Sequence, residues 1–111
     1  MTAEKAFAKN PDAKAVYLTS PDYFGTLSDI KSFAELAHKN GAKLLVDNAH
    51  GAHLHFLESS EHPIALGAHI CADSAHKTLP ALTGAAYLHI SKTAGRDYLS
   101  RAREMLSVFS S

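Results

Sequence analysis

A lysine among small polar residues is the first feature of the sequence that could do chemistry. Lys77 lies in the segment Ser74-Ala75-His76-Lys77-Thr78, directly after a short apolar run. A lysine at the mouth of a sheet can lose its proton when it is partly desolvated, and its neutral amine can then attack an aldehyde. Lys77 is therefore a candidate for Schiff-base formation, although most lysines are simply solvated loop residues.

An aspartate supplies a second group that such chemistry uses. Asp47 ends the nearly continuous apolar run at 43–47. Pyridoxal phosphate is bound through a lysine Schiff base and needs a carboxylate beside its pyridine nitrogen, so that the ring stays protonated. At about 4 Å and an effective dielectric near 20, the attraction is roughly 4 kcal/mol before desolvation losses. Asp47 could supply this carboxylate, or it could cap a turn.

The elements that must position these residues follow an α/β pattern. A strand, a one-sided helix, a second strand, a polar connection and a third strand succeed one another, which is typical of a doubly wound layer. Sites in such layers form beyond the carboxyl ends of the strands. Three strand ends carry polar residues that could converge on one ligand: Thr19-Ser20-Pro21, Asp47-Asn48-Ala49-His50 and Ser74-Ala75-His76-Lys77.

The expected bounds of these elements come from local patterns. Ser28 is the expected N-cap of a helix that ends at Asn40-Gly41, and the first ten residues read as a helix end. The apolar run at 43–47 suggests a strand covered on both faces. The expected strands cover 15–19, 43–47, 69–73 and 85–90, a short helix or turn covers 64–68, and a terminal helix covers about 93–109.

Two of these segments carry a family resemblance. Val46-Asp47-Asn48-Ala49-His50-Gly51-Ala52-His53 and the later Asp73-Ser74-Ala75-His76-Lys77-Thr78-Leu79-Pro80 resemble the major domain of the ornithine/lysine/arginine decarboxylases. The segment Thr19-Ser20-Pro21-Asp22-Tyr23-Phe24-Gly25 is similar to the family's preceding strand end. The resemblance covers about residues 15–90. It implies a fold-type-I pyridoxal-phosphate transferase large domain, present in part.

The resemblance also implies a role for each matching residue. Lys77 would form the internal aldimine and later move protons, and Asp47 would pair with the pyridine nitrogen. Ala49 would pack against one face of the ring, where only a small side chain leaves room. Ser74 would hydrogen-bond the phosphate, unless it only caps the following turn. His76 would lie beside the lysine near the phosphate or aldimine, and His50 is a further candidate for cofactor binding.

The implied reaction is decarboxylation of a basic amino acid, with pyridoxal phosphate accepting the electrons that carbon dioxide leaves behind. Family members are several times longer, so we expect the chain, residues 1–111, to be a fragment of the major domain, with a core at about 15–90 and a helix at about 93–109. A homodimer or a missing partner segment would complete the site. The sequence leaves open whether the chain is active without the missing segments.

Bulk composition bounds the alternatives. Eleven basic residues balance eleven acidic ones, which gives no reason to expect a nucleic-acid or anionic-membrane partner. The single cysteine, Cys71, lies in an apolar run, cannot form an internal disulfide, and suggests a reducing, cytoplasmic setting. No apolar stretch approaches the roughly 20 residues that span a bilayer.

Eight histidines leave two rival hypotheses open. A histidine-rich metal site would draw on His50, His53, His55, His62, His69 and His76, since imidazole binds zinc and related ions. Their spacing matches no familiar metal motif, and we expect no metal site. The other hypothesis is a non-catalytic remnant whose exposed faces pair with itself or with a missing partner.

Overall fold

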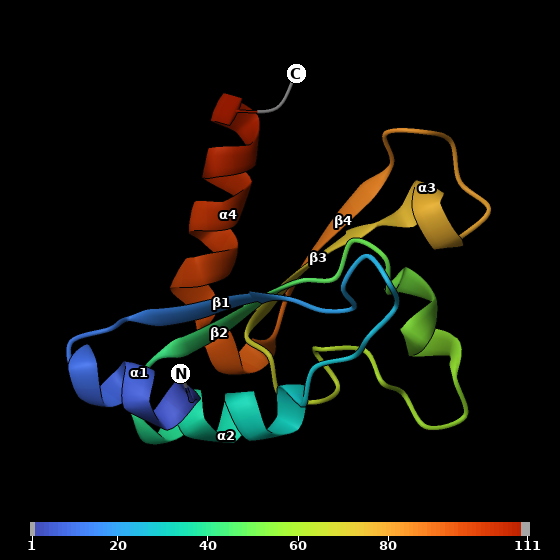
Figure 1. Ribbon diagram of the computed structural model, residues 1–111. Helices are drawn as coiled ribbons and strands as arrows, with labels where there is room; N and C mark the ends of the chain where they lie inside the picture. The colour runs from blue at the N-terminus through green and yellow to red at the C-terminus, as the bar shows by residue number, and fades with distance from the viewer. Residues whose placement is uncertain (1, 110–111) are drawn as a thin grey trace.

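The computed structural model describes residues 2–109 as a four-stranded sheet with helices on either side (Figure 1). The strands are β1 (Ala15–Thr19), β2 (Lys43–Asp47), β3 (Ile70–Ser74) and β4 (Ala86–Ile90). The α-helices are α1 (Ala3–Lys9), α2 (Ile30–Lys39), α3 (Ala75–Thr78) and α4 (Arg96–Phe109), and two 3₁₀ helices cover Ala52–Phe56 (η1) and Lys92–Ala94 (η2).

The sheet brings three strand ends to one edge. Its order is β1-β2-β3-β4, with β1, β2 and β3 parallel and β4 antiparallel to β3. The expected mostly parallel sheet flanked by helices is confirmed. The carboxyl ends of β1, β2 and β3 therefore share an edge, and the loop that leads into β4 returns there.

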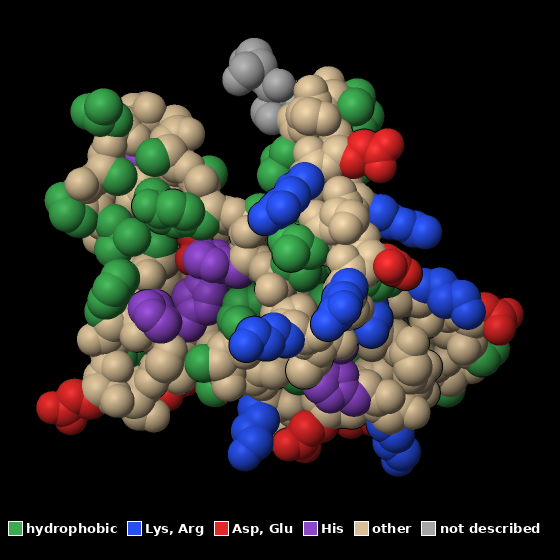
Figure 2. Space-filling view, turned by 180° about the vertical axis from the view of Figure 1, so that it is seen from behind, with side chains coloured by type: hydrophobic (Ala, Val, Ile, Leu, Met, Phe, Trp, Pro, Cys, Tyr) green, Lys and Arg blue, Asp and Glu red, His purple; other side chains and the backbone are tan. Residues whose placement is uncertain are grey.

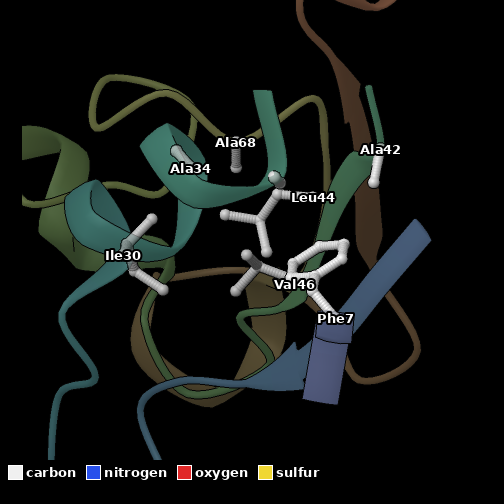
Figure 3. Packing of buried hydrophobic residues seen from close by; sticks show 8 residues of the cluster. Phe7, Ile30, Ala34, Ala42, Leu44, Val46 and Ala68 are labelled. Carbon is white, nitrogen blue, oxygen red and sulfur yellow. The ribbon is translucent and has the colours of Figure 1, made fainter. Parts of the chain in front are cut away.

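The core lies between α1, α2 and one face of the sheet. Leu44 and Val46 alternate on the buried side of β2 and meet Phe7 of α1 and Ala34 of α2 (Figure 3). Burying side chains of this size stabilises the fold by about 1.5–3 kcal/mol each. This packing fixes β2, and with it the position of Asp47, against the helices.

The opposite face of the sheet is more open than the sequence predicted. Leu45 is only half-buried and its neighbour in register, Tyr17, is 67% exposed, so the expectation that β2 is covered on both faces is wrong for the described residues. The helix α4 stands over this face with no buried residue, and the Nζ atom of Lys43 lies 5.7 Å from the centre of the Tyr98 ring. Within residues 2–109, no helix is both long and apolar enough to cross a membrane.

One helix boundary differs from the expected one. The N-cap of α2 is Asp29, whose carboxylate accepts hydrogen bonds from the backbone and the hydroxyl of Ser32 at 3.1 and 2.6 Å. Ser28 is instead tied to the end of β1, because its backbone N–H donates to the hydroxyl of Ser20 at 2.9 Å. Aspartate and serine are about equally good caps, so the tertiary bond decides between them.

Candidate active site at the carboxyl edge of the sheet

Lys77 lies on a one-turn helix at the carboxyl end of β3. β3 ends at Ser74, and α3 starts at the next residue, so the lysine follows the strand by three residues. Lys77 is exposed, whereas Ser74 and His76 are half-buried. The Ser74 side chain makes no capping bond to α3. The turn thus presents a lysine amine and a serine hydroxyl at the edge where β1 and β2 also end.

His76 is turned toward the strand that returns from this edge. Its Nδ1 atom lies 3.1 Å from the carbonyl oxygen of Ala85, just before β4. A carbonyl only accepts, so Nδ1 carries the proton and Nε2 is the ring nitrogen that can contact a ligand.

Asp47 ends β2, one strand away from the lysine. Its Oδ1 atom accepts the backbone N–H of Ala49 at 3.1 Å, and its Oδ2 atom accepts the hydroxyl of Tyr17 at 3.3 Å. The negative charge of Asp47 raises the pKa of Tyr17, since ionisation would place two like charges side by side. Asp47 is half-buried, so the carboxylate is held in place and still reaches the open side of the sheet.

His50 borders a groove beside this edge. The groove has a volume of about 440 Å³ and is lined by the loop after β1 and by the segment around η1, with Tyr23, Phe24, His50 and His53 among its residues. The rings of Tyr23 and His50 lie 6.1 Å apart. The structure thus brings the segment 47–50 next to the loop 21–27. Within this arrangement the His50 ring faces Tyr23 of the loop.

A buried polar cluster underlies the same edge, on the face of the sheet that carries Val46. The Asp73 carboxylate accepts Nε2 of His62 and Nε2 of His89, both at 2.9 Å, and the Nδ2 amide of Asn48 at 2.8 Å. The Cys71 thiol lies 3.3 Å from the Oδ1 atom of Asp73. These hydrogen bonds join the end of β2, β3, β4 and the 57–67 loop. Four members of the cluster are buried: Asn48, His62, Cys71 and Asp73.

Electrostatics in this cluster favour an ionised aspartate beside a protonated thiol. Burial opposes the charge of Asp73, but hydrogen bonds from His62, Asn48 and Cys71 outweigh it and hold the pKa of this carboxyl well below its ordinary value of 3.8. Burial and the charge of Asp73 raise the pKa of the Cys71 thiol far above its ordinary value. Burial of Asn48 costs folding free energy, because its Oδ1 atom is buried without a hydrogen-bond partner.

The histidines singled out from the sequence do not gather into one group. Within the described residues, the group with metal-ligand geometry is His62, Cys71 and Asp73, of which only His62 was among the sequence candidates. His69 has a structural role, since its Nδ1 accepts the backbone N–H of Leu44 at 3.0 Å. Burial, followed by the charges of His38 and Lys43, lowers the pKa of His69.

Sequence reasoning missed Asn48, Asp73 and His89 as members of a polar cluster and treated Cys71 only as a buried apolar residue. A signal was present, because Cys71 and Asp73 are two residues apart in a strand and so share a face. An aspartate on the buried face of a strand needs partners. Those partners come from segments that the local pattern does not link to β3.

Comparison with known proteins decides the family. The model of the family described as "Orn/Lys/Arg decarboxylase, major domain" matches residues 1–111. The chain belongs to this family. The resemblance of the Asp47 and Lys77 segments to the decarboxylase major domain is confirmed.

Curated relatives extend well beyond the matched region. An arginine decarboxylase of Bacillus subtilis is 38% identical over 110 residues, which are 96% of this chain and 22% of that protein. An uncharacterized protein of Bacillus subtilis, YaaO, is 42% identical over 95 residues, or 83% of this chain and 19% of that protein. The chain thus spans about a fifth of the length of these two relatives.

Solved structures support the fold. A methionine gamma lyase from Micromonospora echinospora superposes with a TM-score of 0.72 at 23% identity, over 96% of this chain and 29% of that one. The expected fold class, an α/β domain with a mostly parallel sheet flanked by helices, is confirmed, and the chain covers less than a third of the similar structure. At this identity the likeness concerns the fold alone.

Proposed function

We propose that the chain contributes the pyridoxal-phosphate attachment site of a decarboxylase that acts on a basic amino acid of the lysine, ornithine or arginine class. The observation that carries the proposal is the shared strand edge. Asp47 ends β2, and Lys77 follows the end of the adjacent parallel strand β3. A cofactor lying across this edge would meet a carboxylate and an amine at once.

The donor set fits this cofactor. The exposed Lys77 amine is reachable by an aldehyde, and the Ser74 hydroxyl, which does not cap α3, is available for a phosphate oxygen. The Asp47 carboxylate is oriented by the N–H of Ala49. The small side chain of this alanine would leave space for a flat ring. Pyridoxal phosphate, when bound, supplies the electron sink for the carbon that loses carbon dioxide.

Each candidate residue of the site has a role in this proposal. Lys77 attaches the cofactor and, once displaced by a substrate amine, holds a proton at Nζ for return to the product. Asp47 keeps a proton on the ring nitrogen by charge attraction. Nε2 of His76 is the ring nitrogen that would contact the phosphate or the lysine, because Nδ1 is hydrogen-bonded to Ala85. His50, whose ring lies 6.1 Å from that of Tyr23, would close this side of the site.

The remaining parts of the site would come from outside the matched region. β1 and β4 are the outer strands of the described sheet, each paired on one side only, and the face of Tyr17 and Leu45 is open. A second copy of the chain or further segments of a longer protein would pack there. The substrate class rests on the family, since none of the described contacts identifies a site for a basic side chain.

Borohydride trapping tests the attachment site. The chain is incubated with pyridoxal phosphate, reduced, and mapped by peptide mass spectrometry. We expect a pyridoxyl adduct on Lys77 that is lost in Lys77→Ala, with much weaker labelling of the other lysines. Equal labelling of Lys5, Lys14, Lys43 and Lys92 would overturn the proposal that this chain forms the attachment site.

A further inference from the structure

Three buried side chains with metal-binding atoms meet beneath the carboxyl edge of the sheet, and a fourth, His89, contacts one of them. The ligand atoms of His62, Cys71 and Asp73 all lie within 4.8 Å of one another. The Cys71 sulfur is 4.0 Å from Nε2 of His62, and Nε2 of His89 is 2.9 Å from the same Asp73 oxygen that His62 contacts. Figure 2 shows histidine side chains gathered at one place on the molecular surface seen from behind.

We propose that His62, Cys71, Asp73 and His89 form a binding site for one Zn²⁺ ion or a similar borderline-soft divalent ion. Zinc in proteins is held tetrahedrally by thiolate, imidazole and carboxylate groups at about 2.0–2.3 Å. Ligand atoms in such a centre are about 3.3–3.8 Å apart, by the geometry of a tetrahedron of that size. Two contacts between the proposed ligand atoms lie on either side of this range, because Nε2 of His62 is 2.9 Å from Oδ2 of Asp73 and 4.0 Å from the Cys71 sulfur.

Burial and accessibility both suit such a site. His62 and Asp73 side chains are 6% and 4% exposed, whereas the His89 side chain is 40% exposed. An ion can therefore approach from the His89 side and be enclosed by the other three ligands. Asn48 holds Oδ1 of Asp73 at 2.8 Å, which leaves Oδ2 to face the two imidazoles. Such outer hydrogen bonds orient the ligands of metal sites.

Metal binding at this site should change the protonation of its ligands in two measurable ways. Binding through Nε2 moves the proton of each neutral imidazole to Nδ1, and the Cys71 thiol releases one proton to solvent while Asp73 stays ionised. For His62 this shift places a proton on the Nδ1 atom that now accepts the backbone N–H of Ile64 at 3.3 Å. Metal binding should therefore break that bond and speed hydrogen exchange at the Ile64 amide.

Cobalt titration of the metal-free chain tests the site, because Zn²⁺ has no absorption of its own. We expect one Co²⁺ per chain, a sulfur-to-cobalt charge-transfer band, and competition by Zn²⁺. Calorimetry in two buffers of different protonation enthalpy should report one proton released per ion. Cys71→Ala should abolish the band, and circular dichroism checks that this variant keeps its secondary structure. Asn48→Leu should keep the band but weaken the affinity about 10- to 100-fold.

His53→Gln is the matched control, because His53 is an exposed histidine on η1, outside the cluster. This variant should bind Co²⁺ as the unchanged chain does. Absence of stoichiometric binding to the unchanged chain would overturn the site. A charge-transfer band that survives Cys71→Ala, or binding that is lost with His53→Gln, would also overturn it. Because none of the four ligands is Lys77 or Asp47, the result is independent of cofactor labelling.

Discussion

Nε2 of His62 donates a hydrogen bond of 2.9 Å to Oδ2 of the buried Asp73 carboxylate. The backbone N–H of Ile64 points at the other ring nitrogen of His62, so the imidazole is held as the Nε2–H tautomer. This bond fastens the irregular 57–67 loop to β3, and α3 with Lys77 follows β3 directly.

Removing this bond should destabilise the fold. We expect His62→Leu to lower the free energy of unfolding by about 1.5–3 kcal/mol, the range for a hydrogen bond to a charged group, because it leaves part of a buried carboxylate unpaired. Urea denaturation in the absence of added metal measures the change. His53→Leu, at an exposed position, should stay within about 0.5 kcal/mol. Equal effects of the two substitutions would contradict the structural role of His62.

Gly51 should tolerate no side chain. A Cβ atom at this position would lie 2.1 Å from Oδ1 of Asn48 and 2.7 Å from Cδ of Pro21, while its φ of −117° is open to any residue. We expect Gly51→Ala to cost about 1–3 kcal/mol through overpacking. Gly41→Ala is the comparison, since its Cβ would meet open space and only its φ of +66° adds strain, about 1–2 kcal/mol. Thermal unfolding measures the stability of both variants. A Gly51→Ala variant no less stable than the unchanged chain would refute the clash.

Stability should fall in mildly acidic solution because of His69. The pKa of His69 is lowered in the fold, so the folded state binds fewer protons than the unfolded state. Its contribution is therefore fully present above the ordinary pKa of 6.5 and is lost as pH falls through the lower, folded value. Urea midpoints measured across this range should decline with pH. The decline should be shallower in His69→Gln, and an unchanged slope would rule out His69 as its source.

Asp47 should matter for the affinity of the cofactor more than for its attachment. An attraction of about 4 kcal/mol, halved by solvation, corresponds to roughly 30-fold in affinity. We expect Asp47→Asn to need about 10- to 30-fold more pyridoxal phosphate for half-maximal labelling of Lys77. Asp12→Asn, in the exposed turn before β1, is the control and should label normally. An Asp47→Asn chain with an unchanged labelling curve would remove Asp47 from the site.

The sequence by itself determined the main strands and the strand ends that carry the proposed cofactor-binding residues. Strong local signals were enough: the apolar runs gave β1 and β2 with their observed bounds, and Asn40-Gly41 marked the end of α2. The Asp47 and Lys77 segments identified the family from the order of their residues alone, and the whole-chain family match bears this out.

The tertiary structure decided which segments and side chains are neighbours. The antiparallel direction of β4 and the exposure of Leu45 depend on which strands and helices pack together. The sequence of a short apolar run does not predict these packing partners. The Asp73 cluster draws its partners from positions 11, 16 and 25 residues away along the chain. Local patterns report the periodicity of one segment, whereas hydrogen bonds between segments form only once sheet register has been set.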